Sequence, residues 1–203
     1  MAGPDVALDE GDVDPDPFVQ FGRWFDDASA VLDAPEAMAV ATADTDGRPS
    51  VRMVLLKAWG RGGFTFFTNY DSRKGHELEA NPWAALLFHW DPLGRQVRIE
   101  GPVRRSDPGE SDAYFASRAF GSQVGAYASH QSRTVADRPT LDARVVALAS
   151  ELGGGDVPRP SWWGGFRVEP RVFEFWQQGQ SRMHDRLRYV PEGETWRIER
   201  LQP

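Results

Sequence analysis

The feature that most constrains the fold is a series of short strand-like runs, each bounded by turn residues. Residues 37–43 and 50–58 are two such runs, and they flank a turn at residues 45–48. A Gly-containing turn between two apolar runs is typical of a β-hairpin. Further runs of this kind occupy residues 64–69, 83–90, 96–104, 163–168, 172–177, 182–189 and 195–201. Because these runs do not alternate regularly with helices, the pattern favours a mainly β or α+β barrel over a doubly wound fold.

Four helices are predicted around this barrel. Asp16 followed by Pro17 is a typical helix start, and apolar residues continue at helical spacing to about residue 33. The other three helices are predicted at residues 72–81, 107–116 and 139–152. Gly153 ends the last of them.

Charge divides the chain into two parts. The 203 residues carry a formal net charge of −7. Residues 1–17 hold many of the acids and no base, and their three prolines and low hydrophobicity predict a disordered acidic arm. Residues 18–203 are nearly neutral and are predicted to form a single domain, so a nucleic-acid partner is not expected.

Several classes of protein are disfavoured by the sequence. There is no cysteine, which excludes thiolate catalysis and cysteine-held metals. The four histidines have no metal-ligand spacing, so no metal site is expected. The longest apolar run is residues 83–88, too short to span a bilayer. With no export signal, we expect a cytoplasmic protein.

Two basic clusters could hold an anion. Arg52 and Lys57 bracket an apolar run, while Arg73 and Lys74 follow Ser72 at a predicted helix N-terminus. Free backbone N–H groups and the helix dipole favour an anion there. The residues alone leave open a second interpretation, in which these are solvated surface cations.

A third cluster lies near the C-terminus. If residues 182–189 form a strand, Arg182, His184 and Arg186 share one face. That face could bind an anion beside a titratable histidine, or it could be a solvent-facing row on an edge strand.

A fourth cluster combines Tyr114, Arg118 and Ser122. Tyr114 and Arg118 are four residues apart, which makes them neighbours if the helix includes both. Ring contact together with bidentate hydrogen bonding suits a phosphorylated aromatic ligand. An ordinary helix surface with one packed tyrosine is the alternative.

Together these segments resemble the FMN-dependent pyridoxine/pyridoxamine 5′-phosphate oxidases over about residues 8–203. The matching segments are DPFVQFGRWF (16–25), GRPSVRMVLLK (47–57), FFTN (66–69), SRK (72–74), LGRQV (93–97), YFASR (114–118), GSQVG (121–125), QS (131–132), WGGFR (163–167), FWQ (175–177), RMHDR (182–186) and ERLQP (199–203).

The resemblance implies a split β-barrel with peripheral helices that binds FMN in a homodimer. Residues 161–203 would supply C-terminal strands to the dimer and the active site. The implied reaction oxidises pyridoxine 5′-phosphate or pyridoxamine 5′-phosphate to pyridoxal 5′-phosphate, with dioxygen as oxidant and hydrogen peroxide as product.

The resemblance also implies roles for individual residues, some of them acting from the partner subunit. The implied FMN contacts are Arg52, Met53, Val54, Leu55, Leu56, Lys57, Phe67, Thr68, Arg73, Lys74, Gln96, Gln131, Ser132, Trp176 and Arg186. The implied substrate contacts are Lys57, Tyr114, Arg118, Ser122, Arg182, Met183 and His184. Of these, Arg182 and His184 are the implied catalytic pair over the pyridine ring.

This chain departs from the family in two ways. It has Phe67 where the family often has Tyr, and its N-terminal arm lacks the Arg and Tyr that often close over the substrate. We therefore expect that the arm is not a catalytic lid. Two alternatives remain: a related flavin oxidase for another aromatic substrate, such as a phenazine precursor, and a non-catalytic flavin-binding or haem-binding barrel.

Overall fold

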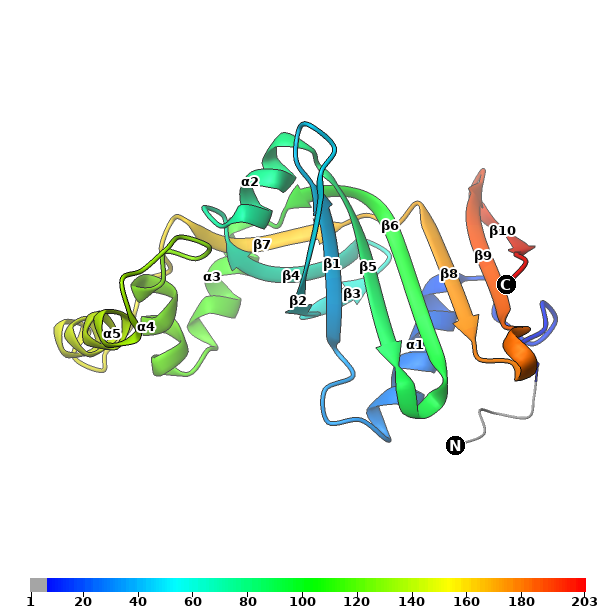
Figure 1. Cartoon of the computed structure of the whole chain (residues 1–203), viewed down its shortest axis with the longest axis horizontal. Coiled ribbons are helices and arrows are strands. Elements are labelled where there is room, and N and C mark those ends of the chain that lie inside the picture. Colours follow the sequence, from blue (N-terminus) through cyan, green and yellow to red (C-terminus); the bar gives the residue numbers. More distant parts are fainter. Residues whose placement is uncertain (1–6) are drawn as a thin grey trace.

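The computed structural model describes residues 7–203, and within them ten strands form one curled antiparallel sheet (Figure 1). The strands are β1 (Ala37–Ala43), β2 (Pro49–Leu55), β3 (Ala58–Gly60), β4 (Gly63–Asn69), β5 (Trp83–Trp90), β6 (Arg95–Arg105), β7 (Trp163–Val168), β8 (Val172–Gln177), β9 (Asp185–Glu192) and β10 (Thr195–Arg200). The order along the main path is β10-β9-β8-β6-β5-β1-β2.

The long strand β6 makes the sheet curl into a half-barrel. Its first half pairs with β8 and its last residues, Val103 to Arg105, pair with β7. From there β7 pairs with β4, and β4 pairs with the short β3. One strand thus carries two branches of the sheet, which is how the split barrel forms.

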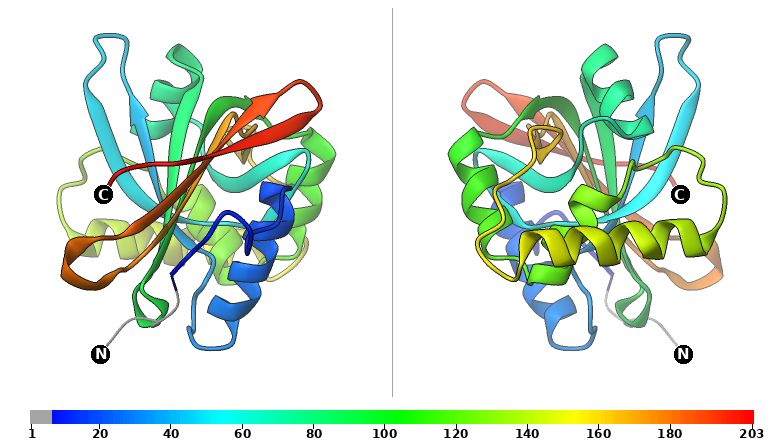
Figure 2. Two further views of the ribbon diagram at one scale, coloured as in Figure 1. Left: turned by 90° about the vertical axis from the view of Figure 1, so that its right-hand side faces the viewer. Right: turned by 90° about the vertical axis from the view of Figure 1, so that its left-hand side faces the viewer.

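Five helices surround the sheet in the described part of the chain. They are α1 (Pro17–Ser29), α2 (Arg73–Ala80), α3 (Pro108–Ala116), α4 (Phe120–Ala128) and α5 (Arg138–Leu152). Figure 2 shows α5 lying across one side of the molecule, away from α1. Two 3₁₀ turns complete the set, η1 (Asp91–Leu93) and η2 (Gln180–Arg182).

The core is an aromatic cluster that joins α1 to the sheet. The Phe21 ring lies 4.9 Å from the Phe64 ring and 5.1 Å from the Phe88 ring, in edge-to-face geometry. Trp24 packs edge-on against Phe175 at 5.2 Å. Such buried aromatic pairs contribute both apolar area and directional contacts. The helix begins as predicted, with the Asp16 carboxylate accepting from the Phe18 amide.

The predicted mainly β barrel is confirmed, and three local predictions are wrong. The expected strand at 50–58 breaks at Leu56, whose buried side chain joins the core, so that β2 and β3 are separate. Helix α4 lies in a stretch for which no helix was predicted. Strand β9 begins at Asp185, three residues later than expected, because the chain makes a 3₁₀ turn first.

The prediction of a disordered arm is also wrong for residues 7–17, while residues 1–6 lie outside the described part. Leu8 and Val13 are buried in the core cluster. The guanidinium of Arg200 binds the Glu10 carboxylate at 2.7 Å and donates to the Leu8 carbonyl at 2.8 Å. Composition indicated disorder, but two apolar side chains and a complementary arginine hold this segment against β9 and β10.

No helix among the described residues is long and apolar enough to span a membrane.

Candidate functional site

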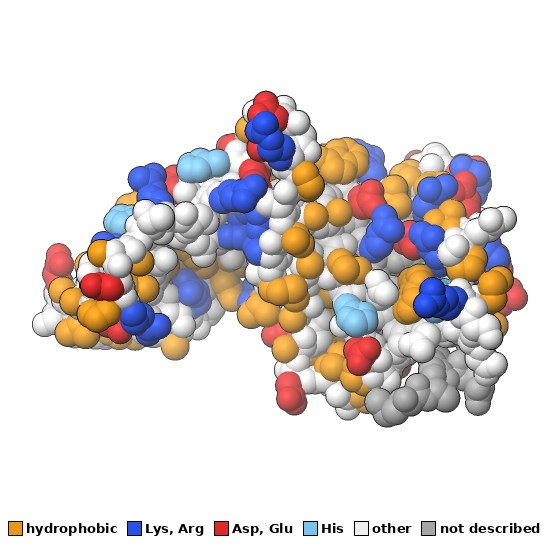
Figure 3. All heavy atoms as spheres, in the orientation of Figure 1, with side chains coloured by type: hydrophobic (Ala, Val, Ile, Leu, Met, Phe, Trp, Pro, Cys, Tyr) orange, Lys and Arg blue, Asp and Glu red, His pale blue; other side chains and the backbone are white. Residues whose placement is uncertain are grey.

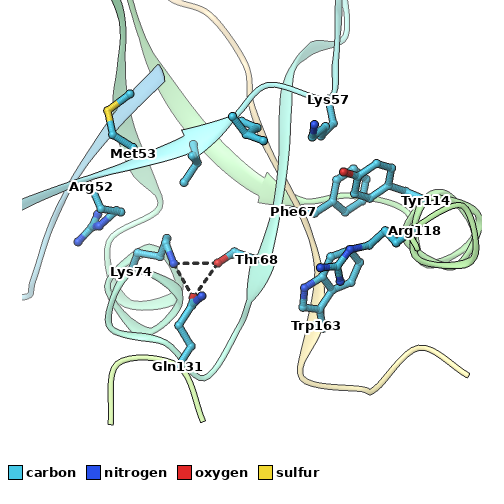
Figure 4. Close-up of a pocket in the computed structure, with 12 residues that line it drawn as sticks. Arg52, Met53, Lys57, Phe67, Thr68, Lys74, Tyr114, Arg118, Gln131 and Trp163 are labelled. Atoms are coloured by element: carbon cyan, nitrogen blue, oxygen red, sulfur yellow. Dashed lines mark hydrogen bonds between the residues drawn. The ribbon is translucent and has the colours of Figure 1, made fainter. Parts of the chain in front are cut away.

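The candidate site is a pocket of about 490 Å³ between β2, β4, α2 and α3 (Figure 4). Its lining residues are Arg52, Met53, Val54, Leu55, Lys57, Phe67, Thr68, Lys74, Tyr114, Arg118, Gln131 and Trp163. Four of these side chains are cationic, and no carboxylate of residues 7–203 lines the pocket. A concave site with this charge pattern suits an anionic ligand.

Lys74 is the most buried of the four cations. Its Nζ donates to Gln131 Oε1 at 2.7 Å and to Thr68 Oγ1 at 2.8 Å, and these three residues form the triangle in Figure 4. Burial, together with the nearby charge of Arg52, lowers the pKa of Lys74 to about 8. An anion bound here would favour the charged ammonium.

A stack of three aromatic rings forms the opposite wall. Phe67 lies 4.2 Å from Tyr114 and 5.5 Å from Trp163, with both ring pairs nearly parallel. The Arg118 guanidinium lies over the Trp163 ring, 4.8 Å from its centroid. This wall can hold a planar ring by stacking and a charged group beside it.

One guanidinium nitrogen of Arg118 is positioned to donate a hydrogen bond to a ligand. Its Nη1 is buried and has no hydrogen-bond partner within residues 7–203. Burial lowers the pKa of Arg118 while the charge of Tyr114 opposes this. A buried guanidinium nitrogen without a partner is costly, so a ligand oxygen at this point would relieve the cost.

Arg118 lies just beyond helix α3, so it is not a neighbour of Tyr114 on one helix face. Helix α3 ends at Ala116, so Arg118 sits in the short connection before α4. Tyr114 and Arg118 nevertheless line the same pocket, and Ser122 of α4 borders a smaller cavity with Arg118. The predicted cluster of Tyr114, Arg118 and Ser122 therefore does come together, because Arg118 lies in a loop after α3 and Ser122 lies on α4.

The predicted anion site at the start of α2 is divided between two neighbouring cavities. Ser72 caps the helix as expected and accepts from the Gly75 amide at 3.3 Å. Lys74 faces the main pocket, whereas Arg73 and Ser132 line an adjoining groove. Ser132 has a φ of 71°, in the left-handed region that non-glycine residues rarely adopt.

A second group of predicted residues forms a row across β6, β8 and β9. Gln96 is paired with Trp176, and Trp176 is paired with Arg186. The Arg186 Nε donates to Glu174 at 2.8 Å. The His184 ring lies 4.7 Å from the Trp176 ring. Residues directly opposite each other in a sheet share a face, so these side chains form one surface.

Arg182 is placed differently from the prediction. It belongs to the 3₁₀ turn η2 and not to strand β9, so it does not alternate with His184 and Arg186 along one strand face. Ser181 and Arg182 have φ values of 52° and 65°. His184 precedes the strand, and its Nδ1 accepts from the Gly179 amide at 3.2 Å. Arg182 and Met183 are exposed here.

The pocket and the row are far apart within one chain. Strand β8 lies four strand-to-strand steps from β2 along the sheet, about 19 Å at the usual spacing of about 4.8 Å. In Figure 1, β2 and β4 lie to the left of β8 and β9. Each chain thus carries two separated groups of predicted site residues.

Two residues at the site were not predicted from the sequence. Trp163 lines the pocket and supports Arg118, although the sequence suggested only that it begins a strand. Glu77 binds Arg73 through Oε1 and Arg52 through Oε2. The spacing of Arg73 and Glu77, four residues apart on a helix, is the signal that could have identified this pair.

Comparison with known proteins identifies related chains over nearly the full length. The family model described as "Pyridoxamine 5'-phosphate oxidase" matches residues 25–150, and the one described as "Pyridoxine 5'-phosphate oxidase C-terminal dimerisation region" matches residues 163–203. These two regions cover both groups of site residues.

Curated relatives and a solved structure agree with these models. A pyridoxine/pyridoxamine 5′-phosphate oxidase of Rubrobacter xylanophilus is 54% identical over 98% of this chain and 92% of its own. One of Cupriavidus taiwanensis is 56% identical over 97% and 93%. The crystal structure of PhzG from Burkholderia lata 383, in complex with tetrahydrophenazine-1-carboxylic acid, is 35% identical with a TM-score of 0.91, and the match covers all of both chains. This chain, which has the split-barrel fold, therefore belongs to the pyridoxine/pyridoxamine 5′-phosphate oxidase family.

Proposed function

We propose that this protein is an FMN-dependent oxidase that converts pyridoxine 5′-phosphate or pyridoxamine 5′-phosphate to pyridoxal 5′-phosphate. The observation that carries the proposal is the gathering of four cations in one pocket that, in the described part of the chain, no carboxylate lines. FMN and the substrate each bring a phosphate, so together they supply the negative charge that this pocket suits.

The residues present fit FMN as the cofactor. Lys74, Thr68 and Gln131 form a polar cluster at one side of the pocket, and Arg52 borders it. Strand β2 lies along the pocket, so that its backbone can contact a flat ring. When bound, FMN would accept two electrons and a proton, as a hydride, from the substrate's 4′-carbon, while the 4′-hydroxyl or 4′-amine releases a second proton; the two electrons and two protons then reduce dioxygen to hydrogen peroxide. With the amine substrate, water would hydrolyse the resulting imine to the aldehyde and ammonia.

The other side of the pocket suits the substrate phosphate. Arg118 offers its unpartnered Nη1, Tyr114 offers a hydroxyl, and Lys57 adds a charge. Ser122 borders the adjoining cavity beside Arg118. These groups would hold the phosphate while the stacked Phe67 supports the neighbouring ring.

We further propose that the active site forms between two copies of the chain. The matched C-terminal dimerisation region contains Trp176, His184 and Arg186, which lie far from the pocket of their own chain. The outward face of β2 exposes Val51 and Met53, with 67% and 64% of their surface accessible. Hydrophobic side chains follow the middle of this face in Figure 3, beside a group of basic side chains. An exposed apolar strip of this kind is typical of a subunit interface.

In this arrangement Arg182 and His184 of one subunit would face the pocket of the other. Because the Gly179 amide donates to His184 Nδ1, a neutral His184 carries its proton on Nε2. The imidazole could then donate from Nε2 to the substrate, while Arg182 supplies a positive charge to stabilise negative charge on the ring or its substituent.

A second candidate is a related flavin oxidase that acts on a phenazine precursor. It is favoured by the 35% identity and the TM-score of 0.91 to PhzG, whose structure contains tetrahydrophenazine-1-carboxylic acid. The higher identity to the curated vitamin-phosphate oxidases and the Tyr114 and Arg118 pair favour the phosphorylated substrate.

Oxygen consumption by the purified protein tests the proposal. We expect turnover with pyridoxine 5′-phosphate or pyridoxamine 5′-phosphate, and little with unphosphorylated pyridoxine or a tetrahydrophenazine carboxylic acid. Turnover of the tetrahydrophenazine alone would establish the second candidate. Failure of the protein to take up FMN would contradict both.

A further inference from the structure

We propose that Glu77 is a positioning residue that holds Arg52 and Arg73 in place for the phosphate of FMN. The inference rests on the proposed function, because it takes FMN as the ligand. A carboxylate beside an anion site would by charge alone repel a phosphate. Its contacts indicate a different role.

The Glu77 carboxylate joins three elements of the fold. Its side chain is 5% exposed. Oε1 accepts from Arg73 Nε at 2.8 Å, within helix α2. Oε2 accepts from Ser50 Oγ of β2 at 2.5 Å and from the hydroxyl of Thr42 in β1. Both oxygens are therefore occupied by donors from the protein.

The same oxygen helps to fix Arg52. The Arg52 Nη2 lies 3.3 Å from Glu77 Oε2 and also donates to the Ser50 hydroxyl. Its Nη1 donates to Thr42 Oγ1 at 2.5 Å and to the Val40 carbonyl at 3.3 Å. A guanidinium held at both ends has one orientation, so little side-chain entropy would be lost when a phosphate binds to it.

Glu77 also stays ionised over the working range of the protein. Burial raises its pKa, but hydrogen bonds from Ser50, Thr42 and Arg73, together with the charge of Arg52, outweigh this effect and lower the pKa to about 2. Glu77 thus offsets part of the repulsion between two neighbouring arginines. Arg52 lines the main pocket and Arg73 lines the adjoining groove, and the held pair connects the two cavities.

Glu77 could instead be a purely structural link between α2 and the β1–β2 hairpin. The two roles predict different changes in the binding affinity for flavins with and without a phosphate. Riboflavin has the same ring and side chain as FMN but carries no phosphate. A positioning role predicts a loss of FMN affinity alone, whereas a structural role predicts an equal loss for both flavins.

The test measures the dissociation constants of FMN and riboflavin by quenching of flavin fluorescence, after bound flavin is removed from the full-length protein. For Glu77→Gln we expect FMN binding weaker by about tenfold or more, the usual effect of losing a charge-assisted contact. Riboflavin binding should change by less than about threefold. Glu79→Gln is the matched control, because Glu79 lies on the exposed side of the same helix and pairs with Arg105 of β6.

A double-mutant cycle with Arg73→Met then shows whether the effect passes through that arginine. Additive losses of FMN affinity from Glu77→Gln and Arg73→Met, or an equal loss for riboflavin, would overturn the inference. If Glu77→Gln does not fold, Glu77→Asp keeps the charge with a shorter reach, and the same selective loss of FMN affinity is expected. If the unaltered protein binds no FMN, the proposed function fails. If it binds FMN and the variants keep its preference over riboflavin, only this inference fails.

Discussion

Truncation of Val13 tests whether the N-terminal arm is part of the folded domain. Val13 is 7% exposed and belongs to the same core cluster as Phe21 and Trp24. Val13→Ala removes two methyl groups, which at about 0.8 kcal/mol each, with a small cavity term, lowers the free energy of unfolding by about 1.5–2.5 kcal/mol. Val31→Ala is the matched control, since Val31 is 53% exposed and its truncation should change stability by less than about 0.5 kcal/mol.

The assay is thermal denaturation of both variants at one protein concentration and with the same excess of FMN, because ligand and subunit concentration both shift the transition. We expect Val13→Ala to lower Tm by about 3–10 °C, at about 2–4 °C per kcal/mol for a domain of this size. Michaelis constants should stay close to those of the unaltered protein, as Val13 is not among the residues that line the pocket. Equal Tm values for the two variants would refute the reasoning, since a detached arm contributes no buried surface.

Three further predictions concern the site itself. FMN affinity should weaken by up to about tenfold per pH unit as the pH rises above about 8, because Lys74 in the FMN-free protein then loses its proton and with it the positive charge that attracts the phosphate. Measuring the FMN dissociation constant from pH 6.5 to 9.5 checks this, and Lys74→Met should make that constant less dependent on pH. Arg118→Met should raise the KM of the phosphorylated substrate by about tenfold or more while FMN stays bound, because a buried donor to the phosphate is lost; unchanged kinetics would contradict the assigned contact. Arg182→Leu should lower kcat/KM by about one to two decades with FMN retained. Full activity of this variant would show that Arg182 has no role in the active site.

The sequence predicts the sheet better than the site. Alternating apolar runs and turn residues give the bounds of β7 and β8, because a strand that pairs on both sides has few alternatives. The break at Leu56 was not predicted, since the strand-like pattern extends to Ala58, whereas in the structure Leu56 is buried in the core cluster and lies between two separate strands.

At the site, the cationic residues could be predicted from the sequence, but the residues that hold them in place could not. The cations Arg52, Lys74 and Arg118 were identified from the sequence. The contact of Arg118 with Trp163 joins residues 45 positions apart and depends on the pairing of β4 with β7. Likewise, Glu77 meets Arg52 only because α2 packs beside the β1–β2 hairpin. Long-range contacts of this kind have no local signature.

The 3₁₀ turn before β9 shows a different limit. The sequence RMHDR alternates as a strand would, yet Ser181 and Arg182 adopt left-handed backbone. Gly179 makes this possible, because a Cβ at that position would lie 1.8 Å from the Met183 carbonyl oxygen. The close approach of two backbone segments overrides the alternation that predicted the strand.

Anaerobic addition of substrate to the purified protein, loaded with FMN, tests the central claim most directly. With pyridoxine 5′-phosphate we predict that the visible absorbance of the flavin is bleached, that pyridoxal 5′-phosphate forms in an amount equal to the bound flavin, and that admitting dioxygen restores the absorbance. A flavin spectrum that persists after the anaerobic addition of both pyridoxine 5′-phosphate and pyridoxamine 5′-phosphate would contradict the claim.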